Sequence, residues 1–157
     1  MGKKKVAGPA NSEGRGGTPA PRVVLDTNVL IPALLFDGPP NKLMSLWLEK
    51  RIVILVSREV LVEYYRVLAY PKFGLTPAEI REIIAMNILP FAETVSVGSH
   101  PPIIREDPAD DKFLFLAEDG RARHIVSGDK HLLSLGKYKG IEILPARSFL
   151  ESFQEFR

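Results

Sequence analysis

Short apolar runs alternate with longer stretches of helical periodicity through most of the chain. Strands are predicted where apolar and β-branched residues run together, over residues 22–26, 52–56, 94–97, 124–127 and 140–144. Between these runs, apolar residues recur every three or four positions, which is typical of helices about 10–15 residues long. Strands separated by such helices imply a mostly parallel sheet with helices on both faces. We therefore predict an α/β fold, a three-layer α/β/α sandwich around a central, mostly parallel sheet.

Capping residues and prolines set the limits of the predicted helices. Ser57 is a favourable N-cap for a helix over residues 58–70, which Pro71 ends. Residues 76–79, Thr-Pro-Ala-Glu, form a capping box that opens a helix reaching about residue 89. Asp110 can cap a helix that begins at residue 111 and ends near residue 121. The other helices are expected over residues 27–36, which include Pro32, over 43–48 with Asn41 as cap, just after residue 129, and over 146–156.

The first 21 residues differ in composition from the rest of the chain. They hold five glycines and three prolines and show no apolar periodicity. Such a segment cannot bury enough apolar surface to offset the entropy lost on ordering, so we expect residues 1–21 to form a disordered tail. Residues 22–157 are expected to form one domain, which is long enough to bury a core.

Simple counts exclude several kinds of protein and site. No apolar run reaches the ~18 residues of a membrane span, and residues 1–5 are not followed by a hydrophobic signal segment. We therefore expect a cytoplasmic protein that does not bind a membrane. The chain has no cysteine, which removes disulfides, thiolate zinc sites and cysteine nucleophiles.

The formal net charge of +2 is unevenly distributed along the chain. Residues 1–22 carry five basic residues and one acidic residue, so residues 23–157 carry a net charge of −2. The predicted domain is thus slightly acidic, and its overall charge gives no support for nucleic-acid binding. Nucleic-acid binding by this domain would require a local basic patch or a bound metal ion.

Four acidic residues stand where the predicted fold would bring them together. Asp26 ends the first strand, and Asp129 lies just beyond the strand that ends at residue 127. Asp111 opens the helix before that later strand, and Glu63 lies in the helix after the second strand. Open α/β sheets bind ligands at the carboxyl edge of their strands, where we expect Asp26 and Asp129.

Each of the four acids also has an ordinary structural explanation. Asp26 and Asp129 can be turn residues or helix caps. Asp111 can belong to a capping pair at a helix N-terminus, and Glu63 can simply face water. The four together are more informative, because converging carboxylates repel one another and raise their pKa values unless a cation balances them. Oxygen ligands favour a hard ion, so we predict a site for Mg²⁺ or Mn²⁺ rather than zinc.

A metal ion at this edge would suit the hydrolysis of a phosphodiester. Such an ion can polarise a phosphoryl oxygen and generate hydroxide for attack on phosphorus. Asn28 and Ser127 are expected to orient ligands or water rather than to perform acid–base catalysis. A phosphatase-like enzyme with Asp26 as covalent nucleophile is an alternative. That chemistry usually needs a second Asp two residues later, where this chain has Asn28.

In these motifs the chain resembles the PIN domain family of metal-dependent ribonucleases, and more narrowly the stand-alone prokaryotic PIN proteins that are toxins of toxin–antitoxin pairs. The resemblance spans about residues 22–150. It rests on residues 24–30, Val-Leu-Asp-Thr-Asn-Val-Leu, on residues 57–68, on residues 107–111, and on residues 126–129, Val-Ser-Gly-Asp.

The resemblance assigns the catalytic and metal-binding acids residue by residue. They are Asp26, Glu63, Asp111 and Asp129. Glu59, one turn before Glu63, is its rival for the second place. Asp110 and Asp107 remain possible substitutes for Asp111.

The resemblance also implies an activity and partners. It implies a three-layer PIN-like fold, dependence on Mg²⁺ or Mn²⁺, hydrolysis of single-stranded RNA, a homodimer, and inhibition by a small antitoxin protein. The alternative is a catalytically silent PIN-like module that binds RNA or a protein. Apart from the resemblance, the basic residues expected near the predicted edge could hold substrate phosphates. They are Arg58, Lys112 and Lys130, with Arg123 and His131 as further candidates.

Overall fold

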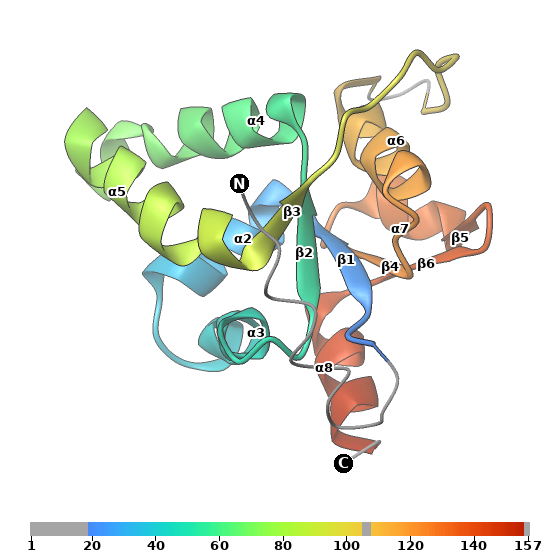
Figure 1. Cartoon of the computed structure of the whole chain (residues 1–157), viewed down its shortest axis with the longest axis horizontal. Helices are drawn as coiled ribbons and strands as arrows, with labels where there is room; N and C mark the ends of the chain where they lie inside the picture. The colour runs from blue at the N-terminus through green and yellow to red at the C-terminus, as the bar shows by residue number, and fades with distance from the viewer. Residues whose placement is uncertain (1–18, 105–107, 156–157) are drawn as a thin grey trace.

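A six-stranded sheet forms the centre of the molecule (Figure 1). The computed structural model describes residues 19–104 and 108–155, so the prediction for residues 1–18 and the candidate Asp107 lie outside the described residues. The strands are β1 (Arg22–Leu25), β2 (Val53–Val56), β3 (Ala92–Thr94), β4 (His124–Val126), β5 (Lys137–Tyr138) and β6 (Ile141–Leu144). Their order is β3-β2-β1-β4-β6-β5, and all neighbours are parallel except β5 and β6.

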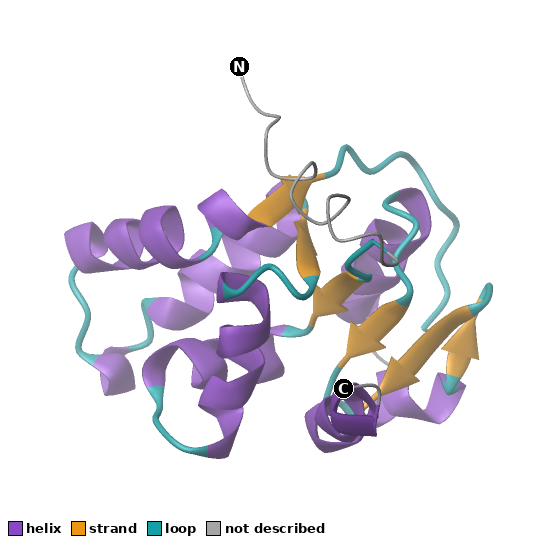
Figure 2. Ribbon diagram, turned by 60° about the horizontal axis from the view of Figure 1, so that its bottom comes forward, coloured by secondary structure: helices purple, strands orange, loops and turns teal. Residues whose placement is uncertain are grey.

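Helices connect the strands, as Figure 2 shows. The α-helices of the described residues are α2 (Thr27–Leu35), α3 (Pro39–Leu48), α4 (Arg58–Leu68), α5 (Pro77–Asn87), α6 (Asp111–Asp119), α7 (Lys130–Leu135) and α8 (Ala146–Glu155). Three single turns of 3₁₀-helix add η1 (Pro71–Phe73), η2 (Leu89–Phe91) and η3 (Pro108–Asp110). Among the described residues, no helix combines the length and the apolar character needed to cross a membrane.

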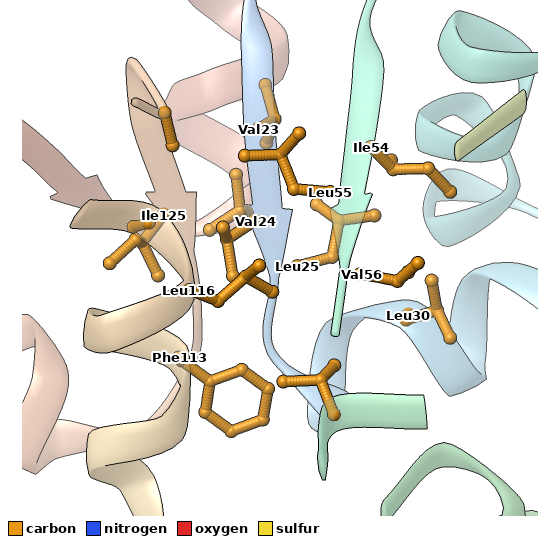
Figure 3. Close-up of a cluster of buried hydrophobic side chains, with 14 of the residues drawn as sticks. Val23, Val24, Leu25, Leu30, Ile54, Leu55, Val56, Phe113, Leu116 and Ile125 are labelled. Atoms are coloured by element: carbon orange, nitrogen blue, oxygen red, sulfur yellow. The ribbon is translucent and has the colours of Figure 1, made fainter. Parts of the chain in front are cut away.

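Both faces of the central strands are covered. Successive side chains of a strand point to opposite faces, yet Val23, Val24 and Leu25 of β1 are all buried. Continuous burial of this kind is typical of parallel strands between two layers of helices. Figure 3 shows side chains of α6 and α2 that meet the strands, among them Phe113 and Leu30. The predicted α/β sandwich with a mostly parallel sheet is confirmed.

Several predicted caps are also confirmed by the structure. Ser57 Oγ accepts a hydrogen bond from Val60 N at 3.2 Å at the start of α4. Thr76 and Glu79 bond reciprocally to each other's backbone N–H groups, at 3.1 and 2.8 Å, and complete the capping box of α5. These local patterns fix where α4 and α5 begin. Asp110 occupies the predicted N-cap position of α6, but its side chain makes no capping hydrogen bond there.

The structure corrects three predicted elements. Asn41 does not cap α3, because the helix begins at Pro39 after Gly38, whose φ of +96° is a conformation that suits glycine. The third strand ends at Thr94 rather than beginning there, since the residues before it pair with β2. Strand β5 was not predicted. It is two residues long and pairs antiparallel with β6, too short for a periodic pattern.

Candidate active site

The candidate site lies at the carboxyl ends of β1 and β4, where the order of the strands in the sheet reverses. Leu25 and Val126 are register partners at the ends of β1 and β4, so the residues that follow them emerge side by side. Asp26 N donates to Val126 O at 2.9 Å and holds the two chain ends together. Within the sheet, β2 lies on one side of β1 and β4 lies on the other, so the strand order reverses at β1. Such a switch point leaves a crevice at the carboxyl ends of the strands.

Asp26 follows β1 at this edge of the sheet and is buried, with 4% of its surface exposed. One oxygen, Oδ1, accepts from Thr27 N at 2.6 Å, and the other, Oδ2, accepts from the Ser127 hydroxyl. The pKa of Asp26 is raised to about 6. Burial is the largest cause, the carboxylates of Glu63 and Asp129 act in the same direction, and the hydrogen bonds from Ser127 and Thr27 oppose the rise. A carboxylate in this setting favours a proton or a cation.

Glu63 reaches the same site from α4. The Thr27 hydroxyl donates to its Oε2, and Lys112 Nζ donates to its Oε1. Arg66 Nη2 lies 3.5 Å from the same Oε1. The hydroxyl of the next residue, Tyr64, donates to the carbonyl oxygen of Leu25 at the end of β1. This buried bond fixes α4 against the strand that carries Asp26, and burial raises the pKa of Tyr64 well above its usual range.

Asp129 occupies the N-cap position of α7. Its Oδ1 accepts from His131 N at 2.7 Å and from Leu132 N at 3.3 Å, and its backbone N donates to Ser127 Oγ at 2.9 Å. Ser127 therefore joins Asp26 and Asp129 through one hydroxyl. The loop is also held from α2, because Asn28 Oδ1 accepts from Gly128 N at 3.3 Å.

Asp111 has a different environment from the other three acids. It is 5% exposed, and its two oxygens accept hydrogen bonds from Ile103 N and Ile104 N, both at 2.9 Å. The next residue of α6, Lys112, bonds to Glu63, so the N-terminus of α6 does lie beside the site. The rival Asp110 lies in η3, directly before α6. The structure thus places Glu63 and Asp129 near enough to Asp26 to raise its pKa, and it ties the carboxylate of Asp111 to a neighbouring loop. The carboxylate oxygens of these four acids, all of which the structure describes, do not gather within 4.8 Å of one another.

A second group of ligand-type side chains lies at the C-terminal end of α6. Suitable atoms of His100, Glu118 and Asp119 lie within 4.8 Å of one another. Tyr138 and Lys139 donate to Glu118, and His100 bonds to Asp119 at 3.0 Å. These side chains already have partners within the protein, and the group is separate from the four predicted acids.

The basic residues predicted to hold phosphates have three different positions. Arg58 and Lys112 line a pocket of about 300 Å³ beside Glu63, together with Glu59, Val62 and Arg66. Lys130 is exposed at the start of α7, next to Asp129. The prediction for Arg123 was wrong, because this residue precedes β4 and lies at the opposite edge of the sheet.

Three residues of the site were missed in the sequence. Thr27 and Tyr64 fix Glu63 and α4, and Arg66 joins the pocket. Thr27 follows Asp26 at the start of α2, where a side chain can reach a neighbouring helix. Its position in the sequence could therefore have indicated a role in the site. The two α4 residues follow Glu63 by one and three positions, which gave no comparable indication.

A comparison with family models decides the relationship. The model described as PIN domain matches residues 22–131, a range that contains all four candidate acids. The chain belongs to the PIN domain family. PIN domains are generally nucleases.

One similar solved structure supports the same fold. The chain resembles the crystal structure of VapBC2 from Rickettsia felis bound to a DNA fragment from their promoter, with a TM-score of 0.50 and 15% sequence identity. The match covers 78% of this chain and 96% of that chain. At this identity the likeness establishes the PIN fold alone. A search of curated protein sequences found no match.

Proposed function

We propose that this PIN domain is a metal-dependent endoribonuclease that hydrolyses phosphodiester bonds of single-stranded RNA. Asp26, Glu63, Asp111 and Asp129 are the proposed ligands of one or two Mg²⁺ or Mn²⁺ ions. The observation that carries the proposal is the buried Asp26, whose pKa is raised to about 6 beside two further carboxylates. Burial is the main cause of this shift, and a divalent cation would stabilise the buried charge and offset the repulsion from the other two acids.

The donor set fits a hard divalent ion. Asp26, Glu63 and Asp129 offer carboxylate oxygens, and the Ser127 and Thr27 hydroxyls hold two of these acids in place. Mg²⁺ and Mn²⁺ prefer such ligands to nitrogen or sulfur. When bound, the ion would polarise a phosphoryl oxygen and lower the pKa of water near the phosphorus.

The other side chains of the site position the acidic residues and the substrate. The Ser127 hydroxyl bonds to the carboxylate of Asp26 and to the backbone N–H of Asp129, and Asn28 holds the loop that precedes Asp129. Arg58, Lys112 and Lys130 are the proposed contacts to substrate phosphates, since they are basic and lie beside the acids. The acids position the ion rather than act as nucleophiles.

The test is a cleavage assay with a conservative variant. Purified wild-type protein should cleave unstructured RNA in the presence of Mg²⁺ or Mn²⁺, and EDTA should stop the reaction. Asp26→Asn should fold normally and lose most of this activity. Asp37→Asn, an exposed substitution of the same kind, should keep it. Undiminished cleavage by Asp26→Asn would remove Asp26 from the site, and failure of the wild type to bind Mn²⁺ at millimolar concentrations would favour a silent binding module.

We further propose that the protein is the toxin of a toxin–antitoxin pair, as its resemblance to the stand-alone prokaryotic PIN toxins suggests. A cognate antitoxin, a homodimer and a cytoplasmic location all remain predictions. A short neighbouring reading frame whose product co-purifies with this chain and stops RNA cleavage would support the toxin role. The absence of any such inhibitor gene would count against it.

A further inference from the structure

Lys112 is the most enclosed cation at the candidate site. Its side chain is 17% exposed, compared with 60% for Arg66, the other cation near Glu63. Lys112 Nζ donates to Glu63 Oε1 and, at 2.6 Å, to the carbonyl oxygen of Ala109. It also lies 5.4 Å from the centre of the Phe113 ring, so the ammonium is held from three directions.

Both oxygens of Glu63 already have a donor. Oε2 accepts from the Thr27 hydroxyl and Oε1 accepts from the Lys112 ammonium. A divalent ion needs a carboxylate oxygen at about 2 Å, and a positive ammonium on the same carboxylate would repel it. Thr27 is neutral and fixed in the first turn of α2, whereas Lys112 has a long, flexible side chain. The contact that must change is therefore the one with Lys112.

We propose that Lys112 competes with the divalent ion for Glu63 and, once displaced, becomes a phosphate-binding group of the adjoining pocket. This inference rests on the proposed function. The pocket is lined by three cations, Arg58, Arg66 and Lys112, and by the acids Glu59 and Glu63. An ammonium released from Glu63 would add its charge to those of the two arginines. An ammonium has three donors and binds phosphate as a point charge. Metal binding and substrate binding are then coupled through one side chain.

Calorimetry with Mn²⁺ tests the competition directly. It should be run near pH 8, above the pKa of Asp26 of about 6. Lys112→Met removes the competing charge and keeps the aliphatic stem, and we expect Mn²⁺ to bind about tenfold more tightly than to the wild type. Arg66→Met is the matched control, because it removes the exposed cation near the same Glu63 oxygen. It should change the Kd by less than about twofold.

Steady-state cleavage of RNA tests the second half of the proposal. With saturating Mn²⁺, Lys112→Met should raise KM several-fold more than it lowers kcat, and Lys112→Arg should restore KM toward the wild-type value. A KM unchanged in Lys112→Met would overturn the phosphate contact. An unchanged or weaker Mn²⁺ affinity in Lys112→Met, with wild-type circular dichroism, would overturn the competition.

These outcomes differ from a failure of the proposed function itself. A wild-type protein that binds no Mn²⁺ would refute the metal site before Lys112 is considered. A wild type that binds Mn²⁺ with the same affinity as Lys112→Met would refute only the role of Lys112. If Lys112→Met does not fold, Lys112→Gln removes the same charge with a polar side chain and serves the same comparison.

Discussion

The Ser127 hydroxyl donates a hydrogen bond to Asp26 Oδ2, although the two residues lie 101 positions apart in the chain. The same oxygen of Ser127 accepts from Asp129 N at 2.9 Å. One buried hydroxyl thus fixes both a carboxylate at the end of β1 and the turn after β4. Leu25 and Val126 are register partners in parallel strands, so the residues that follow them, Asp26 and Ser127, lie next to each other.

Ser127→Ala should disturb both Asp26 and the fold. Loss of the hydroxyl removes a bond that lowers the pKa of Asp26, so this pKa should rise above about 6. The partly buried Asp129 N–H also loses its acceptor, and we expect the free energy of unfolding to fall by about 1–3 kcal/mol. Carbon-detected NMR titration of the Asp26 carboxyl and urea unfolding measure the two effects. Ser134→Ala, which removes an exposed hydroxyl, should change neither.

Asp26 should make the protein less stable as the pH rises. Its pKa is about 6 in the folded protein, whereas an unperturbed aspartate has a pKa of 3.8, so the folded state binds more protons than the unfolded state between these two pH values. Stability attributable to this group is present below pH 4 and is lost as the pH rises through 6. The loss amounts to about 3 kcal/mol at most.

Asp26→Asn isolates this effect. The variant cannot ionise at this position, so it should be more stable than the wild type at pH 8 and lose that advantage toward pH 4. Urea unfolding of both proteins at several pH values gives the difference. Parallel stability curves for the two proteins would mean that Asp26 titrates as an ordinary exposed carboxyl.

The sequence predicted the parts of the fold that depend on local patterns. Ser57 and the capping box at Thr76 were assigned from residue type and spacing alone, and their hydrogen bonds are present. Asn41 was assigned by the same rule and was wrong, because Gly38 and two prolines start α3 earlier. A cap rule identifies a suitable residue but does not choose between two competing helix starts.

The details of the site depend on contacts that a sequence pattern does not contain. The position of Asp26 at the end of a strand was readable, and so was that of Asp129 after the next parallel strand. The bonds of Glu63 to Thr27 and to Lys112 join residues 36 and 49 positions apart. Lys112 was expected to hold phosphate, and only the packing of α6 beside α4 shows that it binds Glu63.

Gly120 is a position where the packing of α6 leaves no room for a side chain. An added Cβ would lie 2.7 Å from Leu55 Cδ1 and 2.9 Å from the carbonyl oxygen of Leu116. Gly120→Ala should therefore destabilise the protein by about 1–3 kcal/mol through overpacking. Gly98→Ala is the control, since its nearest neighbour would be 3.9 Å away, and it should change stability by less than about 0.5 kcal/mol. Equal midpoints in urea for the two variants would contradict this account.

Asp111 and Asp110 can be distinguished by measuring metal affinity and stability in the same variants. Both oxygens of Asp111 accept from backbone N–H groups, and Asn would keep only one acceptor. Asp111→Asn should therefore lower the free energy of unfolding by about 1–3 kcal/mol. Because Asp111 is a proposed metal ligand, Asp111→Asn should also weaken Mn²⁺ binding about tenfold. Asp110→Asn should bind Mn²⁺ like the wild type.

The reverse result would reassign the third acid. If Asp110→Asn loses Mn²⁺ affinity and Asp111→Asn loses only stability, Asp110 is the ligand, and Asp111 holds residues 103–104 against the start of α6. That result would be physically reasonable, since a carboxylate that satisfies two backbone donors has less negative charge to offer an ion. Calorimetry and urea unfolding on the two variants at pH 8 are sufficient to decide between the two assignments.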